Sequence, residues 1–279
     1  MSGLKILIPT DFSVQAEYAY IMVKNLESKI PVDIHFLHVL QVPDTVTMDI
    51  EGNVFTCGEI DVTYVEKQRD IALRKLNNLK TLYGENIHVH LRFGTFTDET
   101  LQFGAENKID LIAMGTKGAF GLKEKISGSS TQFLARKSRI PVLSLMCDRG
   151  DLKINNVLFV HDFSKTEKMD LSIMQKLINN FHCHVHFLQI TGGDPVSERA
   201  KYEIKADSFA AENGIENFTF HILHDKDVER GVNHLLQLED MDIICIGTHG
   251  KGGLFHASAT EKLINHLFKP IISFHIDTH

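Results

Sequence analysis

The stretch LIAMGTKG (residues 111–118) decides the fold, because in it an apolar run ends in a turn bounded by glycines. The same pattern returns as IICIGTHG (residues 243–250). Upstream, Asp11-Phe12-Ser13 and Asp162-Phe163-Ser164 each follow another short apolar run. The upstream landmarks lie 151 residues apart and the glycine turns 132 apart, so the second copy is 19 residues shorter in between. The chain therefore contains an internal duplication.

Short β-rich runs alternate with amphipathic stretches in both copies. In the first copy we expect strands over 4–9, 32–40, 87–93, 109–114 and 140–145, and helices over 14–28, 61–82, 97–107 and 129–138. Ser13 and Thr97 are the expected N-caps of the first and third helices. In the second copy we expect strands near 154–160, 182–190, 217–223, 242–246 and 270–275, and helices near 165–180, 196–213, 227–238 and 258–268. This alternation predicts an α/β fold with parallel strands and helices on both faces.

The composition fits two ordinary domains, which we place at residues 1–148 and 149–279. The segment 43–60 has no counterpart of equal length and is either a small hairpin near the mouth of a site or a solvated connection. No apolar run approaches the roughly 20 residues that span a bilayer, and we expect no signal peptide and four reduced cysteines. These features predict a cytoplasmic protein without a membrane partner. The net charge of −7, without a long basic stretch, argues against nucleic acid as a partner.

Ligands of an open parallel sheet bind beyond the carboxyl ends of the strands, where the strand order reverses. Three segments of the first copy are expected to project there: Pro9-Thr10-Asp11, Val39-Leu40 and Met114-Gly115. The last of these opens a loop with the spacing G-x2-G-x9-G-[ST], from Gly115 to Ser129. Its glycines allow backbone amides to approach a ligand closely. The sequence therefore predicts a ligand site at this edge of the sheet.

The end of this loop is suited to an anion. Gly128, Ser129, Ser130 and Thr131 precede or open a predicted helix, whose free N–H groups and dipole favour negative charge. The loop also carries three lysines, Lys117, Lys123 and Lys125. No G-x4-G-K-[ST] motif occurs, and no G-x-G-x-x-G follows the first strand, so this is neither a P-loop nor a dinucleotide fingerprint.

The glycine spacing, with IPTDFS (residues 8–13) after the first strand and Leu37-His38-Val39 in the second, closely resembles the universal stress protein family. The resemblance covers essentially the whole chain as a tandem pair. It implies two five-stranded parallel sheets in the order 3-2-1-4-5, and members that keep this glycine pattern bind ATP. The family often dimerises, so we expect the two copies to form an intramolecular pseudo-dimer, and a homodimer stays open.

The resemblance also assigns roles to residues of the first copy. It implies Asp11 and Val39 at the adenosine end, with Thr10, Pro9 and Met114 beside them. It implies a second group around the ribose and phosphates, namely Gly115, Thr116, Gly118, Gly128, Ser129, Ser130 and Thr131. A divalent cation such as Mg²⁺ commonly bridges the phosphates in this family.

The second copy departs from the pattern. Gly247 and Gly250 remain, but Ala257 replaces the third glycine, the loop is three residues shorter, and His161 stands where the first copy has Thr10. We therefore expect this half to support the fold rather than to bind ATP. The last strands of the two copies, over 140–145 and 271–275, are the expected contact between the halves.

Sixteen histidines raise the question of a metal site. The run His182-x-His184-x-His186 would place three imidazoles on one face of a strand, and His35, His38, His88 and His90 lie in the other half. We interpret these as polar, partly exposed strand faces, because structural zinc sites prefer ligands from separate segments.

The resemblance thus implies an ATP-binding stress-response or regulatory protein, and the residues themselves show no convincing catalytic set. A slow ATPase or nucleotide-dependent transferase is the enzymatic alternative. A third hypothesis is a scaffold protein that binds a metal ion instead of a nucleotide.

Overall fold

The computed structural model describes residues 3–43, 45–49, 53–57, 61–116, 130–161, 163, 168–249 and 256–277. The first repeat contains β1 (Leu4–Pro9), α1 (Val14–Glu27), β2 (Val32–Leu40), β3 (Val46–Met48), β4 (Val54–Thr56), α2 (Val62–Tyr83), β5 (His88–Phe93), α3 (Phe96–Glu106), β6 (Leu111–Gly115), α4 (Ser130–Lys137) and β7 (Val142–Leu145). The second contains β8 (Asn156–Val160), β9 (Lys168–Met169), α5 (Ser172–Phe181), β10 (His184–Thr191), α6 (Pro195–Glu212), β11 (Phe218–His224), α7 (Val228–Leu238), β12 (Ile243–His249), α8 (His256–His266) and β13 (Ile271–Asp277).

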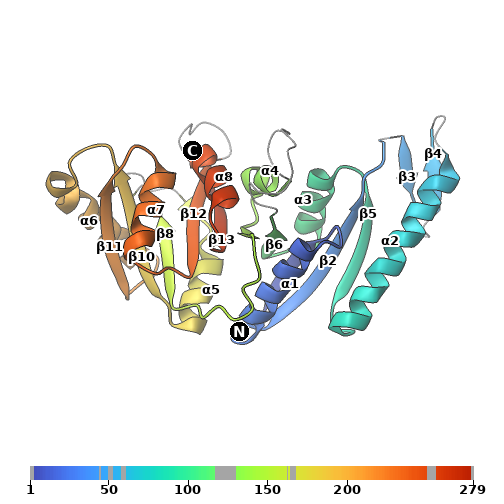
Figure 1. Cartoon of the computed structure of the whole chain (residues 1–279), viewed down its shortest axis with the longest axis horizontal. Helices are drawn as coiled ribbons and strands as arrows, with labels where there is room; N and C mark the ends of the chain where they lie inside the picture. The colour runs from blue at the N-terminus through green and yellow to red at the C-terminus, as the bar shows by residue number, and fades with distance from the viewer. Residues whose placement is uncertain are drawn as a thin grey trace.

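The strands of both repeats join into one sheet, in the order β11-β10-β8-β12-β13-β7-β6-β1-β2-β5, with β9 attached to β13 (Figure 1). Within each repeat the five main strands are parallel and follow the order 3-2-1-4-5, so the predicted fold class is confirmed twice. The repeats meet where β7 and β13 pair antiparallel. The expected contact between the last strands is therefore confirmed. The exact domain boundary at 148/149 stays a prediction.

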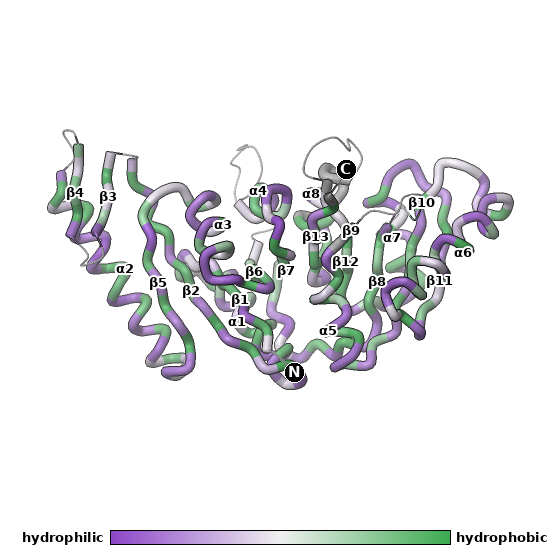
Figure 2. The backbone as a smooth tube through the Cα atoms, turned by 180° about the vertical axis from the view of Figure 1, so that it is seen from behind, coloured by the Kyte–Doolittle hydropathy of each residue, from purple (hydrophilic) through white to green (hydrophobic). Residues whose placement is uncertain are grey.

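Two hydrophobic layers cover the two faces of this sheet, and each extends through both repeats. One layer joins alternate strand residues such as Ile6 and Val157 to helices α1, α2, α5 and α6. The other joins residues such as Leu7 and Leu158 to α3, α4, α7 and α8. Figure 2 shows the helices with both hydrophobic and hydrophilic residues along their length, as expected for elements buried on one side only.

Local signals explain where several helices begin. Ser13 caps α1 as predicted, since its hydroxyl accepts a hydrogen bond from the Ala16 amide at 3.4 Å. The prediction of Thr97 as the cap of the third helix is wrong, because α3 begins earlier and Thr95 holds the cap position. Thr95 has an extended backbone, and its hydroxyl donates to Asp98 at 2.6 Å. Two threonines in this stretch made the choice ambiguous from sequence.

The predicted helix over 165–180 is also wrong at its start. Lys168 and Met169 form β9, which pairs antiparallel with the end of β13, and α5 begins only at Ser172. A long-range pairing has replaced local helix propensity here. In the first repeat, the segment 43–60 contains the β3–β4 hairpin, which packs on α2 through Val46, Val54 and Val65. Among the described residues, no helix combines the length and apolar composition needed to cross a bilayer.

Candidate functional site

Several described residues of the predicted nucleotide site lie where the strand order of the first repeat reverses. Strand β1 pairs with β2 on one side and with β6 on the other, all parallel. Pro9 ends β1 and Gly115 ends β6, so their carboxyl ends lie at the same edge of the sheet. Chain crossovers leave from β1 and β6 in opposite directions, which opens a crevice for ligands in folds of this kind.

The segment after β1 is held in place by its own polar groups. The Thr10 side chain is buried, and its hydroxyl accepts a hydrogen bond from the Phe12 amide at 2.9 Å. Asp11 is exposed, and its carboxylate accepts from the Ser13 amide at 3.0 Å. Phe12 has a positive φ of 65°, a conformation that non-glycine residues rarely adopt. The chain therefore turns sharply from β1 into α1 and leaves the Asp11 side chain at the surface.

His38 of β2 is a site neighbour that the sequence did not assign. Its Nδ1 lies 2.7 Å from the Thr10 carbonyl, and because a carbonyl can only accept, Nδ1 carries the proton. The centroids of the His38 and Phe12 rings lie 4.6 Å apart. The Lys75 ammonium of α2 lies over the Phe12 ring, 5.0 Å from its centroid. Burial lowers the pKa of His38, so the imidazole stays neutral near pH 7. The motif Leu37-His38-Val39 was the signal that could have identified it.

Val39 and Met114 are buried side chains at the ends of β2 and β6, within the hydrophobic layer that includes α3 and α4. They can give apolar contact but no polar recognition.

Gly115 is a glycine for a steric reason. A Cβ atom at this position would lie 1.9 Å from the backbone carbonyl oxygen of Gln15, so only glycine lets the first turn of α1 pass this close to β6. This contact fixes α1 against the end of β6 and brings the two chain segments of the predicted site together.

Thr116 follows directly and carries an unusual hydroxyl. The side chain is 3% exposed, and its Oγ1 finds no hydrogen-bond partner within the described part of the chain. The Thr116 amide donates to the Leu145 carbonyl at 2.7 Å, so the backbone is fixed while the hydroxyl is not. A buried polar group without a partner costs about 1–3 kcal/mol, and such groups often mark ligand sites.

The helix on the other side of the predicted loop is α4. Ser130 and Thr131 form its first turn, with Ser130 exposed and Thr131 buried. The predicted residues Gly118, Gly128 and Ser129, like the three lysines of the loop, lie outside the described residues. The structure thus brings Pro9, Thr10 and Asp11 to the same edge as Gly115 and Thr116.

The second repeat differs at the equivalent positions. Thr248, which corresponds to Thr116, is also buried, but its hydroxyl lies 3.0 Å from the Phe274 carbonyl and is satisfied. His161, which replaces Thr10, is buried between rings, with centroids 5.1 Å from Phe163 and 5.4 Å from Phe209. Aromatic side chains therefore occupy space beside the first strand of this repeat.

Helix α4 of the first repeat contacts helix α8 of the second repeat across the junction. Gln132 of α4 donates a hydrogen bond to the Glu261 carbonyl of α8 at 3.0 Å, and Arg136 lies 3.7 Å from the Glu261 carboxylate. Thr248 Oγ1 also lies 3.4 Å from the Ala135 carbonyl of α4. The start of α4 is thus supported by the second repeat.

A cavity of about 590 Å³ lies elsewhere, between the β3–β4 hairpin, α2 and the edge strand β5. Its lining includes Met48, Arg69, His90 and Phe103, and none of the described residues of the predicted nucleotide site. It is a separate surface feature of the first repeat.

Comparisons with known proteins identify the family of this chain. The model of the universal stress protein family matches residues 4–145. Universal stress proteins MJ0531 and MJ0577 of Methanocaldococcus jannaschii are each 28% identical to this chain, over 139 and 149 residues. Each alignment covers 50% of this chain, and 79% and 92% of the respective relative.

The crystal structure of a universal stress protein from Archaeoglobus fulgidus aligns over 99% of both chains, with a TM-score of 0.72 and 19% identity. This likeness extends the fold to both repeats. The chain belongs to the universal stress protein family, with the family's fold repeated in tandem.

Proposed function

We propose that this protein is an ATP-binding regulatory protein that holds one nucleotide in its first repeat. The site would use Thr10, Asp11 and Val39 for the adenosine, and the glycine loop with Ser130 and the start of α4 for the ribose and phosphates. Family members with the G-x2-G-x9-G-[ST] spacing bind ATP, and this chain keeps that spacing once.

The observation that carries this proposal is the unpaired hydroxyl of Thr116. It is buried directly after β6, at the second position of the glycine loop that begins at Gly115. A ligand that accepts or donates a hydrogen bond there would remove the cost of leaving this group unsatisfied. The equivalent Thr248 hydroxyl already donates to the Phe274 carbonyl at 3.0 Å and needs no ligand to satisfy it.

Two further features support binding in only one repeat. The second loop has Ala257 in place of the third glycine and is three residues shorter. The rings of Phe163 and Phe209 crowd His161, where the first repeat has the small side chain Thr10. Both differences reduce the room for a nucleotide.

Phosphate recognition in the first repeat would depend on the start of α4. Backbone N–H groups at a helix N-terminus favour an anion, and Ser130 adds a hydroxyl there. Contacts from α8 to Gln132 and Arg136 hold this helix in position before the ligand arrives. A divalent cation such as Mg²⁺ would supply charge neutralisation between the phosphates, which is a prediction from the family.

Isothermal titration calorimetry with ATP and Mg²⁺ tests the proposal directly. We expect saturation near one ATP per chain, because the intact glycine loop occurs once. Two equivalent sites per chain, or no binding to nucleotide-free protein, would refute it. Mass spectrometry of small molecules released on denaturation would identify a nucleotide retained during purification.

The same samples address the enzymatic alternative. Release of phosphate above the spontaneous rate, lost in a variant that cannot bind ATP, would favour a slow ATPase. Cytoplasmic location and the possible homodimer stay predictions. A regulatory role requires that ATP alters the surface around the loop, which proteolysis with and without ATP would reveal.

A further inference from the structure

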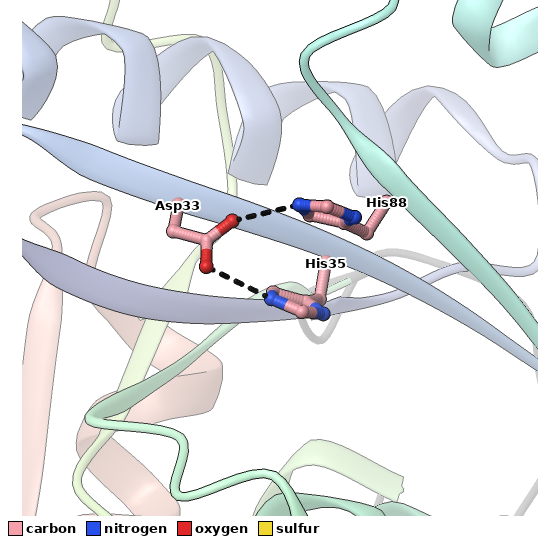
Figure 3. Close-up of side chains that lie close together, drawn as sticks. All are labelled: Asp33, His35 and His88. Atoms are coloured by element: carbon pink, nitrogen blue, oxygen red, sulfur yellow. Dashed lines mark ion pairs between the residues drawn. The ribbon is translucent and has the colours of Figure 1, made fainter.

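Three side chains near the amino ends of β2 and β5 form a compact cluster of metal-ligating groups. The predicted nucleotide site lies at the carboxyl ends of the strands. Asp33 and His35 lie near the start of β2 and point to the same face, and His88 opens the neighbouring strand β5. His35 and His88 are direct partners in the parallel register. Figure 3 shows both imidazoles on one side of the Asp33 carboxylate, with a contact to each of its oxygens.

The spacing of these groups fits a single small ion. His35 Nε2 lies 3.3 Å from Asp33 Oδ2, and His88 Nε2 lies 3.1 Å from Asp33 Oδ1. One ligand atom from each of the three residues lies within 4.8 Å of the others. Ligands at about 2.0–2.1 Å from a tetrahedral zinc ion are separated by roughly 3.3 Å, so small adjustments would suffice.

The inner imidazole turns one nitrogen toward the Asp33 carboxylate. The His35 side chain is 9% exposed, and its Nε2 lies 3.3 Å from Asp33 Oδ2 without meeting hydrogen-bond geometry to any described residue. Its Nδ1 lies 3.1 Å from Nε2 of His90. If Nδ1 donates to His90, then Nε2 presents a lone pair toward Asp33, as a metal ligand must. Outer-shell hydrogen bonds of this kind orient ligating histidines.

The second repeat provides an internal contrast. His186 and His221 occupy the positions of His35 and His90, since both His35 and His186 pair with the equivalent leucine of the first strand. Their ring nitrogens lie 3.0 Å apart, as in the first repeat. There His184 replaces Asp33, and its two nitrogens lie 2.6 Å from Asn217 Oδ1 and 2.8 Å from Thr219 Oγ1. The stacked histidine pair is retained, but the carboxylate is absent, Thr219 stands at the position of His88, and both nitrogens of His184 already have partners.

We propose that Asp33, His35 and His88 bind one divalent transition-metal ion, with Zn²⁺ as the ion that suits them best. Two imidazoles and one carboxylate supply three ligands. Asp33 and His88 are 45% and 55% exposed, so solvent can complete the coordination. The ion would join β2 to the edge strand β5 and thereby stabilise the free edge of the first repeat. The site is remote from the nucleotide residues, which lie at the other ends of these parallel strands.

The test uses protein without an affinity tag, stripped of metal with a chelator and titrated with Zn²⁺ by calorimetry. Asp33→Asn and His88→Gln are the test variants, because both side chains are exposed and their loss should leave the fold intact. The matched control is His184→Gln at the equivalent position of the second repeat. We expect one high-affinity Zn²⁺ per chain in the parent and the control, and at least tenfold weaker binding in both test variants. Mg²⁺ should not compete, because it prefers oxygen ligands.

Cobalt provides a spectroscopic readout of the ligand set. Co²⁺ bound by these residues should give the visible bands of four-coordinate cobalt in the parent chain and in His184→Gln, and lose them in Asp33→Asn. Zn²⁺ should also raise the thermal midpoint of the parent but not that of Asp33→Asn. Equal Zn²⁺ affinity in parent and test variants, or the absence of a high-affinity site in the parent, would overturn the proposal. Equal affinity would mean that Zn²⁺ binds to dispersed surface histidines. The absence of a high-affinity site would mean that Asp33 forms only ion pairs with His35 and His88.

Discussion

Leu143 of β7 and Ile272 of β13 face each other in antiparallel register, so the last strand of one repeat is hydrogen-bonded to the last strand of the other. Both side chains are about 1% exposed. Separate copies would each leave this apolar strand as an unpaired edge, which invites aggregation. The tandem arrangement removes both edges within one chain, and it makes the junction part of the common core.

Val142→Lys should therefore weaken the junction. Val142 is 1% exposed, pairs with Ser273 and lies in the layer shared by α4 and α8. Burial of an unpaired ammonium is costly, so we expect the free energy of unfolding to fall by about 3 kcal/mol or more. The thermal midpoint should fall and the hydrodynamic radius should rise as the repeats loosen.

The matched control for this change is Val196→Lys in α6. Val196 is 84% exposed, so the same substitution there should alter stability by less than about 0.5 kcal/mol. Light scattering and thermal denaturation of both variants provide the comparison. If Val142→Lys keeps the parent midpoint and radius, β7 and β13 do not hold the repeats together.

Removing the hydroxyl at the equivalent positions Thr116 and Thr248 should have opposite effects on stability and on ATP binding. Thr116→Val removes a buried hydroxyl without a partner, so the ligand-free protein should be as stable as the parent or more stable. ATP affinity should fall roughly fivefold, the equivalent of about 1 kcal/mol for one lost hydrogen bond. Thr248→Val removes a hydroxyl that bonds to Phe274, so it should cost about 1 kcal/mol of stability and leave ATP affinity unchanged.

Urea denaturation and calorimetry on both variants measure these quantities. The proposed site would be wrong if Thr116→Val lost stability and kept its ATP affinity, because the hydroxyl would then have a structural role alone.

The third glycine of the loop supplies a test that depends on sequence alone. A side chain at Gly128 would occupy the space where the phosphates are predicted to meet α4. Gly128→Val should weaken ATP binding at least about tenfold, or roughly 1.4 kcal/mol, whereas Ala257→Val in the second repeat should stay within about twofold. Equal losses in two folded variants would contradict binding in a single repeat.

Much of the fold could be predicted from the sequence, because periodicity and duplication report on it directly. The apolar runs of β6 (Leu111–Gly115) and β12 (Ile243–His249) mark the fourth strand of each repeat, and alternation with helices implies parallel order. Local ambiguity caused the errors. Thr95 and Thr97 both suit an N-cap, and His182 adopts a left-handed conformation after α5 instead of extending β10. The interpretation of three imidazoles on one strand face is therefore wrong for His182.

The candidate sites were only partly predictable, because they depend on register. Nothing in the local sequence indicates that His88 lies opposite His35, since the β2–β5 pairing joins segments separated by the hairpin and α2. Asp33 was missed for the same reason. The same limit applies to Gly115, whose glycine requirement comes from the backbone of Gln15. Motif spacing identified the glycine, but the packing that requires it appeared only in three dimensions.

Acid should destabilise the second repeat through the stacked imidazoles of His186, which is buried, and His221, which is half-buried. Burial lowers the pKa of His186 and His221 below the ordinary value of 6.5. The unfolded chain therefore takes up protons first as the pH falls, and the free energy of unfolding decreases below about pH 6.5 until the folded pKa values are reached. Above that pH the contribution is fully present. Urea denaturation at about pH 7.5 and about pH 5.5, with a chelator present, measures this loss.

His221→Gln should reduce the pH dependence, because it removes one of the two titrating groups while an amide can still hydrogen-bond to His186. Ile222→Val is the control on the same strand. It should lower stability by about 0.5–1.5 kcal/mol at both pH values and leave the difference between them unchanged, since it removes a methylene but no titrating group. If His221→Gln shows the same loss on acidification as the parent, then protonation of this pair does not contribute to acid sensitivity.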